Sequence, residues 1–205
     1  MGADGDIQRA VAALSAGESV LLPTDTVYGL VCSAARDDYV ARMYRLKGRD
    51  ALQPTALLAA SVDALYASVP ELQSLAGKII DELLPGPYTL VLSNPARRFP
   101  WLTGTRTDAI GIRVPELPDP SARVLQAVRC VAATSANEPG EPSPATLDAV
   151  PERLRRGCAA EIDTGRLNGR PSTLIDFTGE EPFVIREGIA PSADAIARVR
   201  RALAA

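Results

Sequence analysis

Apolar and polar residues alternate along this 205-residue chain with two different periods. Residues 7–14 carry apolar side chains at i, i+3, i+4 and i+7, which predicts an amphipathic helix that Gly17 ends. The same period predicts further helices from Ser61 and over residues 37–46, 70–84, 119–129, 145–156 and 192–203. Short apolar runs predict strands at residues 19–22, 55–60, 88–92, 109–114, 131–134, 159–163, 173–177 and 182–186.

The order of these elements indicates the fold class. Helices separate most of the strands, which favours a single α/β domain over residues 1–205. The last strands follow one another without helices between them, so we expect a mixed parallel and antiparallel sheet. Residues 138–144 (EPGEPSP) contain three prolines and a glycine, which predicts a loop that is too short to separate two domains.

Composition narrows the chemistry that this chain can perform. The sequence contains no histidine, which excludes Ser-His-Asp triads, Cys-His dyads and every imidazole base. Three cysteines without a CxxC pair argue against a disulfide framework or a zinc site. The net charge of −3 does not suggest an indiscriminate nucleic-acid coat. Any enzyme built on this chain must therefore work by positioning and charge neutralisation.

Hydropathy indicates where the protein acts. No apolar run reaches the roughly 18 residues that a membrane helix needs. The start (MGADGDIQRA) lacks the apolar core of a signal peptide. We therefore expect a cytoplasmic protein without membrane contacts.

Two early segments carry more polar side chains than a connector needs. Residues 23–30 (PTDTVYGL) follow a predicted strand, and their hydroxyls suit a small polar ligand; the alternative is an ordinary turn or helix cap. In residues 45–49 (RLKGR), Arg45, Lys47 and Arg49 share a face if the backbone is extended. Three such cations would attract an anion; the alternative is a solvated helix end.

Three later segments add to this pattern. Arg113 lies inside the apolar segment IGIRVP (residues 110–115), where it suits a carboxylate or phosphate, or else a structural ion pair. In TSAN (residues 134–137), two polar residues spaced by two point into one cleft. The remaining pair is PST (residues 171–173) with IREG (residues 185–188). Neither GxxxxGK[ST] nor GxGxxG occurs, so the predicted anion-binding cleft is neither a P-loop nor a Rossmann site.

Taken in order, seven segments resemble the YrdC-domain family of L-threonylcarbamoyladenylate synthases. They are PTDTVYGL (23–30), KGR (47–49), LLPGPYTLVL (83–92), IGIRVP (110–115), TSAN (134–137), PSTLID (171–176) and IREG (185–188). The resemblance covers residues 20–190 or so, which is the whole domain. It implies one α/β domain around a twisted mixed sheet, with flanking helices and a concave basic cleft.

The resemblance also implies a reaction, a nucleotidyl transfer. ATP, L-threonine and bicarbonate give threonylcarbamoyl-AMP and pyrophosphate, with Mg²⁺ accompanying ATP. The product serves threonylcarbamoylation of a tRNA adenosine, so tRNA and the tRNA-threonylcarbamoyl-transferase proteins are expected partners. Because the substrates supply the nucleophile, the absence of histidine is compatible with this chemistry.

Individual site residues follow from the matched motifs. The catalytic KxR pair, which also binds ATP, is matched by Lys47 and Arg49. The other matches to ATP-binding positions are Gln53, Asn137 and Arg186. The matches to threonine-binding positions are Thr26, Tyr28, Arg113, Ser135 and Ser172. No residue is matched to a metal. The chain departs from the family at Gln53, where Asn or Lys is usual, and at Ala145, where a threonine is usual.

Two alternatives to the synthase remain open at this point. A non-catalytic RNA-binding module of the same fold is suggested by the basic and aromatic residues of Arg97-Arg98-Phe99 and Trp101, although an exposed loop also explains them. A related enzyme that uses another acceptor than threonine is the second alternative.

Overall fold

The computed structural model describes residues 2–204, without the side chains of residues 3 and 75. One nine-stranded sheet runs through these residues in the order β7-β1-β2-β6-β3-β5-β4-β8-β9. The strands are β1 (Val20–Pro23), β2 (Tyr28–Ser33), β3 (Ala56–Ala59), β4 (Tyr88–Ser93), β5 (Ala109–Arg113), β6 (Cys130–Ser135), β7 (Ala160–Glu161), β8 (Thr173–Asp176) and β9 (Phe183–Arg186). Three pairs are parallel (β1–β7, β3–β5 and β4–β8) and the others are antiparallel, which confirms the predicted mixed sheet.

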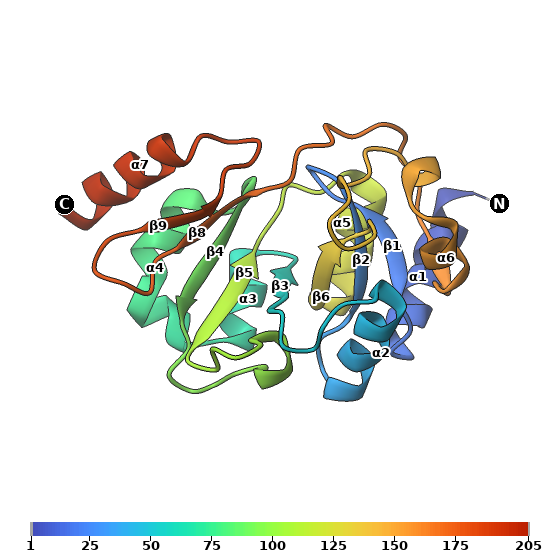
Figure 1. The fold of residues 1–205 in the computed structure, drawn as a ribbon, viewed down its shortest axis with the longest axis horizontal. Coiled ribbons are helices and arrows are strands. Elements are labelled where there is room, and N and C mark those ends of the chain that lie inside the picture. Colours follow the sequence, from blue (N-terminus) through green and yellow to red (C-terminus); the bar gives the residue numbers. More distant parts are fainter. Residues whose placement is uncertain (1, 205) are drawn as a thin grey trace.

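Helices flank this sheet (Figure 1). They are α1 (Ala3–Ser15), α2 (Asp37–Lys47), α3 (Val62–Ser68), α4 (Glu71–Leu83), α5 (Asp119–Val128), α6 (Glu152–Arg156) and α7 (Ser192–Ala204). Local sequence sets their ends: the Ser61 hydroxyl accepts a hydrogen bond from the Ala64 amide at the start of α3, and Gly48 closes α2 with a φ of 68°. None of the helices in residues 2–204 is long and apolar enough to cross a membrane.

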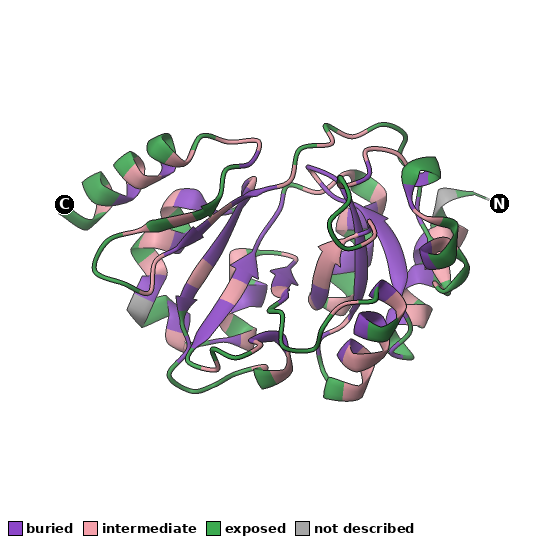
Figure 2. Cartoon of the chain, viewed as in Figure 1, coloured by how far each residue is buried: buried purple, intermediate pink, exposed green. Residues whose placement is uncertain are grey.

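Two hydrophobic clusters lie on opposite faces of the sheet. On β1, Leu21 belongs to the cluster under α2, α3, α4 and α7, whereas Val20 and Leu22 belong to the cluster under α1 and α5. Figure 2 shows that the buried residues concentrate in the strands and on the helix faces turned toward them. β4 and β5 contribute only to the first cluster, through residues such as Leu90 and Ile112. Their other face lies outside both clusters.

The uncovered face of β4 and β5 is where the cavity described below lies. Successive side chains of a strand point to opposite faces, so Val91 and Gly111 face away from the core that holds Leu90 and Ile112. The segment between β7 and β8, drawn in orange in Figure 1, crosses from one half of the sheet to the other. Its Gly169 amide donates to the Thr26 carbonyl at 2.9 Å, which ties the segment to the turn after β1.

Several predicted elements need correction. Residues 28–33 form β2, which the apolar pattern does not predict, because a strand buried on both faces shows no alternation; the polar segment 23–30 therefore ends inside a strand. The helix predicted over 145–156 is a 3₁₀ turn (Leu147–Ala149) and the short α6, because Pro151 interrupts it. Of the two interpretations of residues 45–49, the structure shows the helix end, because α2 continues through Lys47, so Arg45, Lys47 and Arg49 do not share an extended face. The loop at 138–144 is confirmed.

Candidate active site

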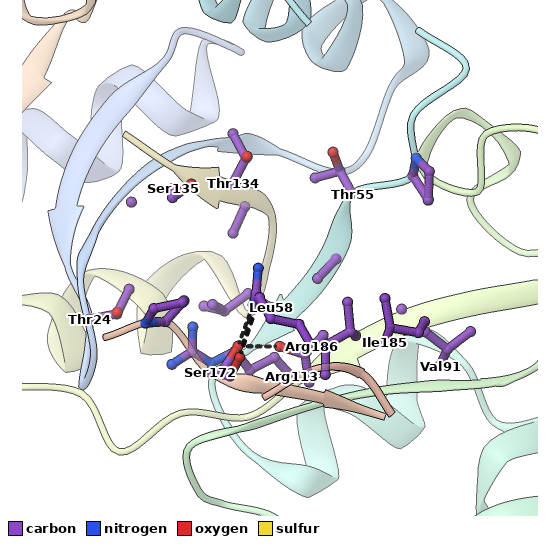
Figure 3. Close-up of a pocket in the computed structure, with 18 of the residues that line it drawn as sticks. Thr24, Thr55, Leu58, Val91, Arg113, Thr134, Ser135, Ser172, Ile185 and Arg186 are labelled. Carbon is purple, nitrogen blue, oxygen red and sulfur yellow. Dashed lines mark hydrogen bonds between the residues drawn. The ribbon is translucent and has the colours of Figure 1, made fainter. Parts of the chain in front are cut away.

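A cavity of about 300 Å³ opens on the uncovered face of the sheet (Figure 3). Its walls come from β2, β3, β4, β5, β6, β8 and β9 and from the loops at their ends. Four of the lining residues are arginines (Arg49, Arg106, Arg113 and Arg186), and none is an aspartate or glutamate. Of the other nineteen lining residues, seven are threonines or serines and twelve are apolar or glycine. A cavity with this lining favours an anionic, polar ligand.

Arg113, at the end of β5, is the most deeply buried of the four arginines. Its Nη2 donates to the Asp25 carboxylate and, at 2.9 Å, to Thr26 Oγ1. Its Nε is buried and has no partner. Burial lowers the pKa of Arg113 and raises the pKa of Asp25, because both charges have left water. The Arg113 guanidinium therefore lies against the cavity and is held by Asp25 and Thr26.

Arg186, on β9, lies beside Ser172, as Figure 3 shows. Its Nη2 donates to the Ser172 carbonyl at 2.9 Å and lies 3.3 Å from Ser172 Oγ. The Ser172 hydroxyl also lies 2.7 Å from Thr89 Oγ1. Burial lowers the pKa of Arg186. Within the described part of the chain, Arg186 donates only to the neutral oxygens of Ser172, so no carboxylate pairs with its charge.

Arg49 follows the Gly48 cap of α2. Its Nη2 donates to the Pro54 carbonyl at 2.5 Å, and its buried Nε has no partner. Burial also lowers its pKa. By contrast, Arg106 forms a 2.7 Å ion pair with Asp176. The cavity thus contains two arginines paired with carboxylates, Arg113 and Arg106, and two that contact only neutral oxygens, Arg49 and Arg186.

Lys47 connects two of the matched motifs. Only 3% of this residue is exposed. Its ammonium donates to the Ser135 carbonyl at 2.8 Å, to Asn137 Oδ1 at 3.0 Å and to the Asn137 carbonyl. Burial, assisted by the charge of Arg49, lowers the pKa of Lys47 to about 8. Three acceptors therefore occupy the three protons of this ammonium and join the KGR segment to TSAN.

Most of the predicted site residues come together. Those that line the cavity are Arg49, Arg113, Ser135, Ser172 and Arg186. Those that contact a lining residue directly are Thr26, Lys47 and Asn137. They come from segments far apart in the sequence, which the sheet order brings to one face.

Tyr28 and Gln53 lie elsewhere. Tyr28 precedes cavity-lining Gly29 on β2, so its side chain points to the opposite face, where its hydroxyl donates to Asp163 at 2.6 Å. The expectation that Tyr28 lines the threonine pocket is therefore not met by the geometry. Gln53 is exposed on the loop before β3 and does not line the cavity. Ala145 also lies outside the lining.

Comparison with known proteins identifies the family to which this fold and cavity belong. Residues 12–188 match the model of the Sua5/YciO/YrdC family, described as "Telomere recombination". The chain belongs to the Sua5/YciO/YrdC family. A family member from Chromohalobacter salexigens, named threonylcarbamoyl-AMP synthase, is 35% identical over 85% of this chain and 94% of its own length.

Solved structures of the family agree with the fold. Pyrococcus abyssi Sua5 in complex with L-threonine superposes with a TM-score of 0.84 at 31% identity, covering 94% of this chain and 56% of that one. The chain thus spans little more than half of the length of the P. abyssi protein. Escherichia coli YciO has a TM-score of 0.82 and covers 95% of this chain, but at 24% identity it supports the fold alone.

Some residues in the cavity or directly behind its lining were missed from sequence. Asp25 lies inside a matched Sua5/YciO/YrdC segment, but no pattern showed that it pairs with Arg113. Thr89 could have been found from sequence, because it is a polar residue within an otherwise apolar strand, on the face opposite the core residues. Arg106 lies in the irregular segment before β5, where no periodicity announces an inward side chain.

Phe99 and Trp101, the aromatic residues that suggested an RNA-binding module, are packed against other parts of the protein. Phe99 and Trp101 pack against the main hydrophobic cluster, edge to face with ring centroids 6.1 Å apart. The Trp101 indole donates to the Ala34 carbonyl at 3.1 Å. Neither ring is therefore available as a free stacking platform, and the names of the relatives favour the synthase over the RNA-binding module.

Proposed function

We propose that this chain is an L-threonylcarbamoyladenylate synthase, a nucleotidyltransferase that converts ATP, L-threonine and bicarbonate to threonylcarbamoyl-AMP and pyrophosphate. The observation that carries the proposal is the hydroxyl-lined cavity with four arginines and no carboxylate among its lining residues. The name of the C. salexigens relative and the bound L-threonine of P. abyssi Sua5 support it. The product then serves tRNA threonylcarbamoylation, with tRNA and the transfer proteins as downstream partners.

The amino acid is assigned to the Arg113 side of the cavity. Its carboxylate would pair with the Arg113 guanidinium where that residue lines the cavity, a charge-assisted hydrogen bond in a buried setting. The Thr26, Ser135 and Ser172 hydroxyls lie on or next to this wall and suit the polar groups of threonine. Because Asp25 offsets part of the charge of Arg113, this wall attracts a polyanion less than the walls that carry Arg49 and Arg186.

The triphosphate is assigned to the arginines without acidic partners. Arg49 and Arg186 contact neutral oxygens only, so their charges are available to a polyanion. Lys47 and Asn137 hold the adjoining loop in place. The lining supplies no carboxylate to coordinate a cation, so Mg²⁺ would enter as part of the substrate, bound by the phosphate oxygens of ATP.

The proposed chemistry needs no nucleophile from the protein. The threonine amine and bicarbonate form a carbamate with loss of water; a carbamate oxygen then attacks the α-phosphorus, and pyrophosphate leaves. The protein brings two anions together and stabilises the charge that develops on the phosphate oxygens. Arginines suit both tasks, because they stay protonated even when buried.

Pyrophosphate release tests this proposal. We expect release that requires ATP, threonine and bicarbonate together, each omitted in turn, with threonylcarbamoyl-AMP identified by mass. Arg36→Ala, which removes an exposed arginine paired with Asp38, should match the wild type. Release of pyrophosphate without threonine and bicarbonate, or no release from the full mixture, would overturn the assignment.

A further inference from the structure

Asp25 occupies an unusual place for a buried carboxylate. Its side chain is 12% exposed and that of Arg113 is 9% exposed. Arg113 lines the cavity, whereas Asp25 does not. The carboxylate therefore stands behind the arginine, and it can influence a ligand only through the guanidinium.

The turn that carries Asp25 is fastened on both sides of it. The Thr24 hydroxyl donates to the Val27 carbonyl at 2.7 Å and accepts from the Thr26 and Val27 amides, each at 3.2 Å. The Tyr28 amide donates to the Pro144 carbonyl, and the segment between β7 and β8 bonds to the turn through the Thr26 carbonyl. These bonds give Asp25 a fixed position relative to β5, from which Arg113 arrives 88 residues later.

A second arginine makes the carboxylate necessary. Arg186 and Arg113 line the same cavity and lie near each other in Figure 3, so their like charges repel. Without Asp25, Arg113 would be a third uncompensated cation beside Arg49 and Arg186. A flexible, unpaired arginine in that position would turn toward the most negative ligand present, the triphosphate.

We propose that Asp25 is a positioning residue that holds the Arg113 guanidinium for the carboxylate of the amino-acid substrate and keeps it from the phosphates of ATP. The inference rests on the proposed function and explains why the amino-acid carboxylate and the phosphates of ATP would bind at different arginines. The Asp25 carboxylate lowers the positive potential at this wall, which weakens the attraction for a polyanion by more than the attraction for a single carboxylate. Arg49 and Arg186, without such a partner, take the phosphates.

Asp25→Asn tests the inference, since it keeps the shape and removes the charge. We expect threonine affinity, measured by calorimetry, to fall roughly 10- to 100-fold, the effect of losing one charge-assisted hydrogen bond. The KM for ATP should change less than about threefold. We expect pyrophosphate to compete only with ATP in the wild type and to compete with threonine as well in Asp25→Asn.

Two comparisons separate positioning from a structural effect. Asp163→Asn removes another carboxylate bonded to the same segment, through Tyr28, and should leave threonine affinity within about twofold. L-threoninol, which lacks the carboxylate, should bind much more weakly than threonine to the wild type, and Asp25→Asn should shrink that difference. If Asp25→Asn does not fold, Asp25→Glu serves instead, and a partial loss of the preference for threonine over threoninol is expected.

The outcomes distinguish the two proposals. A wild-type protein that binds neither threonine nor ATP would defeat the proposed function itself. A wild type that prefers threonine to threoninol, together with an Asp25→Asn variant that keeps the same preference, would overturn only the role of Asp25. Equal losses of threonine and ATP affinity in Asp25→Asn would point to general damage of the cavity and would equally refute positioning.

Discussion

Replacing Lys47 with methionine removes a buried charge while keeping a similar side-chain length. In the native protein the pKa of Lys47 is lowered to about 8, chiefly because burial disfavours the ammonium, whereas the ordinary value is 10.5. Between these two values the native state has released the proton and the unfolded state still binds it. The unfolding free energy contributed by Lys47 therefore rises with pH across this window.

The size of the effect follows from the two pKa values. A full shift of this kind corresponds to roughly 3 kcal/mol, and the part that falls between pH 8 and pH 10 is about 2 kcal/mol. Below pH 8 Lys47 is protonated in both states, so the cost of burying its charge lowers the unfolding free energy by the full amount. The conversion applies here because only 3% of Lys47 is exposed.

Chemical denaturation at a series of pH values measures this contribution. We expect the unfolding free energy of the wild type to rise by about 2 kcal/mol relative to Lys47→Met between pH 8 and pH 10. Taking the difference cancels tyrosine and cysteine titrations that both proteins share. Lys78→Met, which removes a lysine at an exposed position of α4, is the matched control. A difference that stays flat, or falls with pH, would refute the reasoning.

Further substitutions probe the cavity walls. Arg49→Ala should lower kcat/KM for ATP by roughly 100-fold or more in the pyrophosphate assay, with thermal unfolding little changed, while Arg36→Ala keeps full activity. Gly188→Ala places a Cβ 2.3 Å from the Ser172 carbonyl carbon, so we expect a loss of about 1–3 kcal/mol in unfolding free energy and weaker threonine binding. Thr89→Val removes the hydroxyl partner of Ser172 and should raise the KM for threonine up to about tenfold, while an unchanged KM would argue against a role for that bond.

Alternation explains why much of the fold was predictable. β4 and β5 each place core residues at every second position, and the strands over 88–92 and 109–114 were found from that signal. The cavity side of the same strands was visible where a polar residue interrupted the pattern, as Arg113 does. The motifs then supplied what periodicity lacks, namely which distant segments meet.

Other features depend on tertiary contacts that cannot be predicted from the local pattern of apolar and polar residues. β2 is buried on both faces between β1 and β6, so its residues show no polar side to mark a strand. The assignment of Tyr28 to the threonine pocket rests on the resemblance alone, which does not say on which face of a strand each residue of the motif lies. Once residues 28–33 are a strand, Gly29 faces the cavity and Tyr28 cannot. The pairing of Asp25 with Arg113 exists only after β5 has been placed.

The strand order also determines when the cavity forms during synthesis on the ribosome. β2 pairs with β1 at once, but its other neighbour, β6, is made only after β3, β4 and β5, and β6 then joins both halves of the sheet. A nascent chain that has emerged only to residue 170 already contains Arg113 and Arg49 but lacks Ser172 and Arg186. Substrates therefore cannot assist the early stages of vectorial folding by binding. They can stabilise the protein only after β9 has left the exit tunnel and docked on β8.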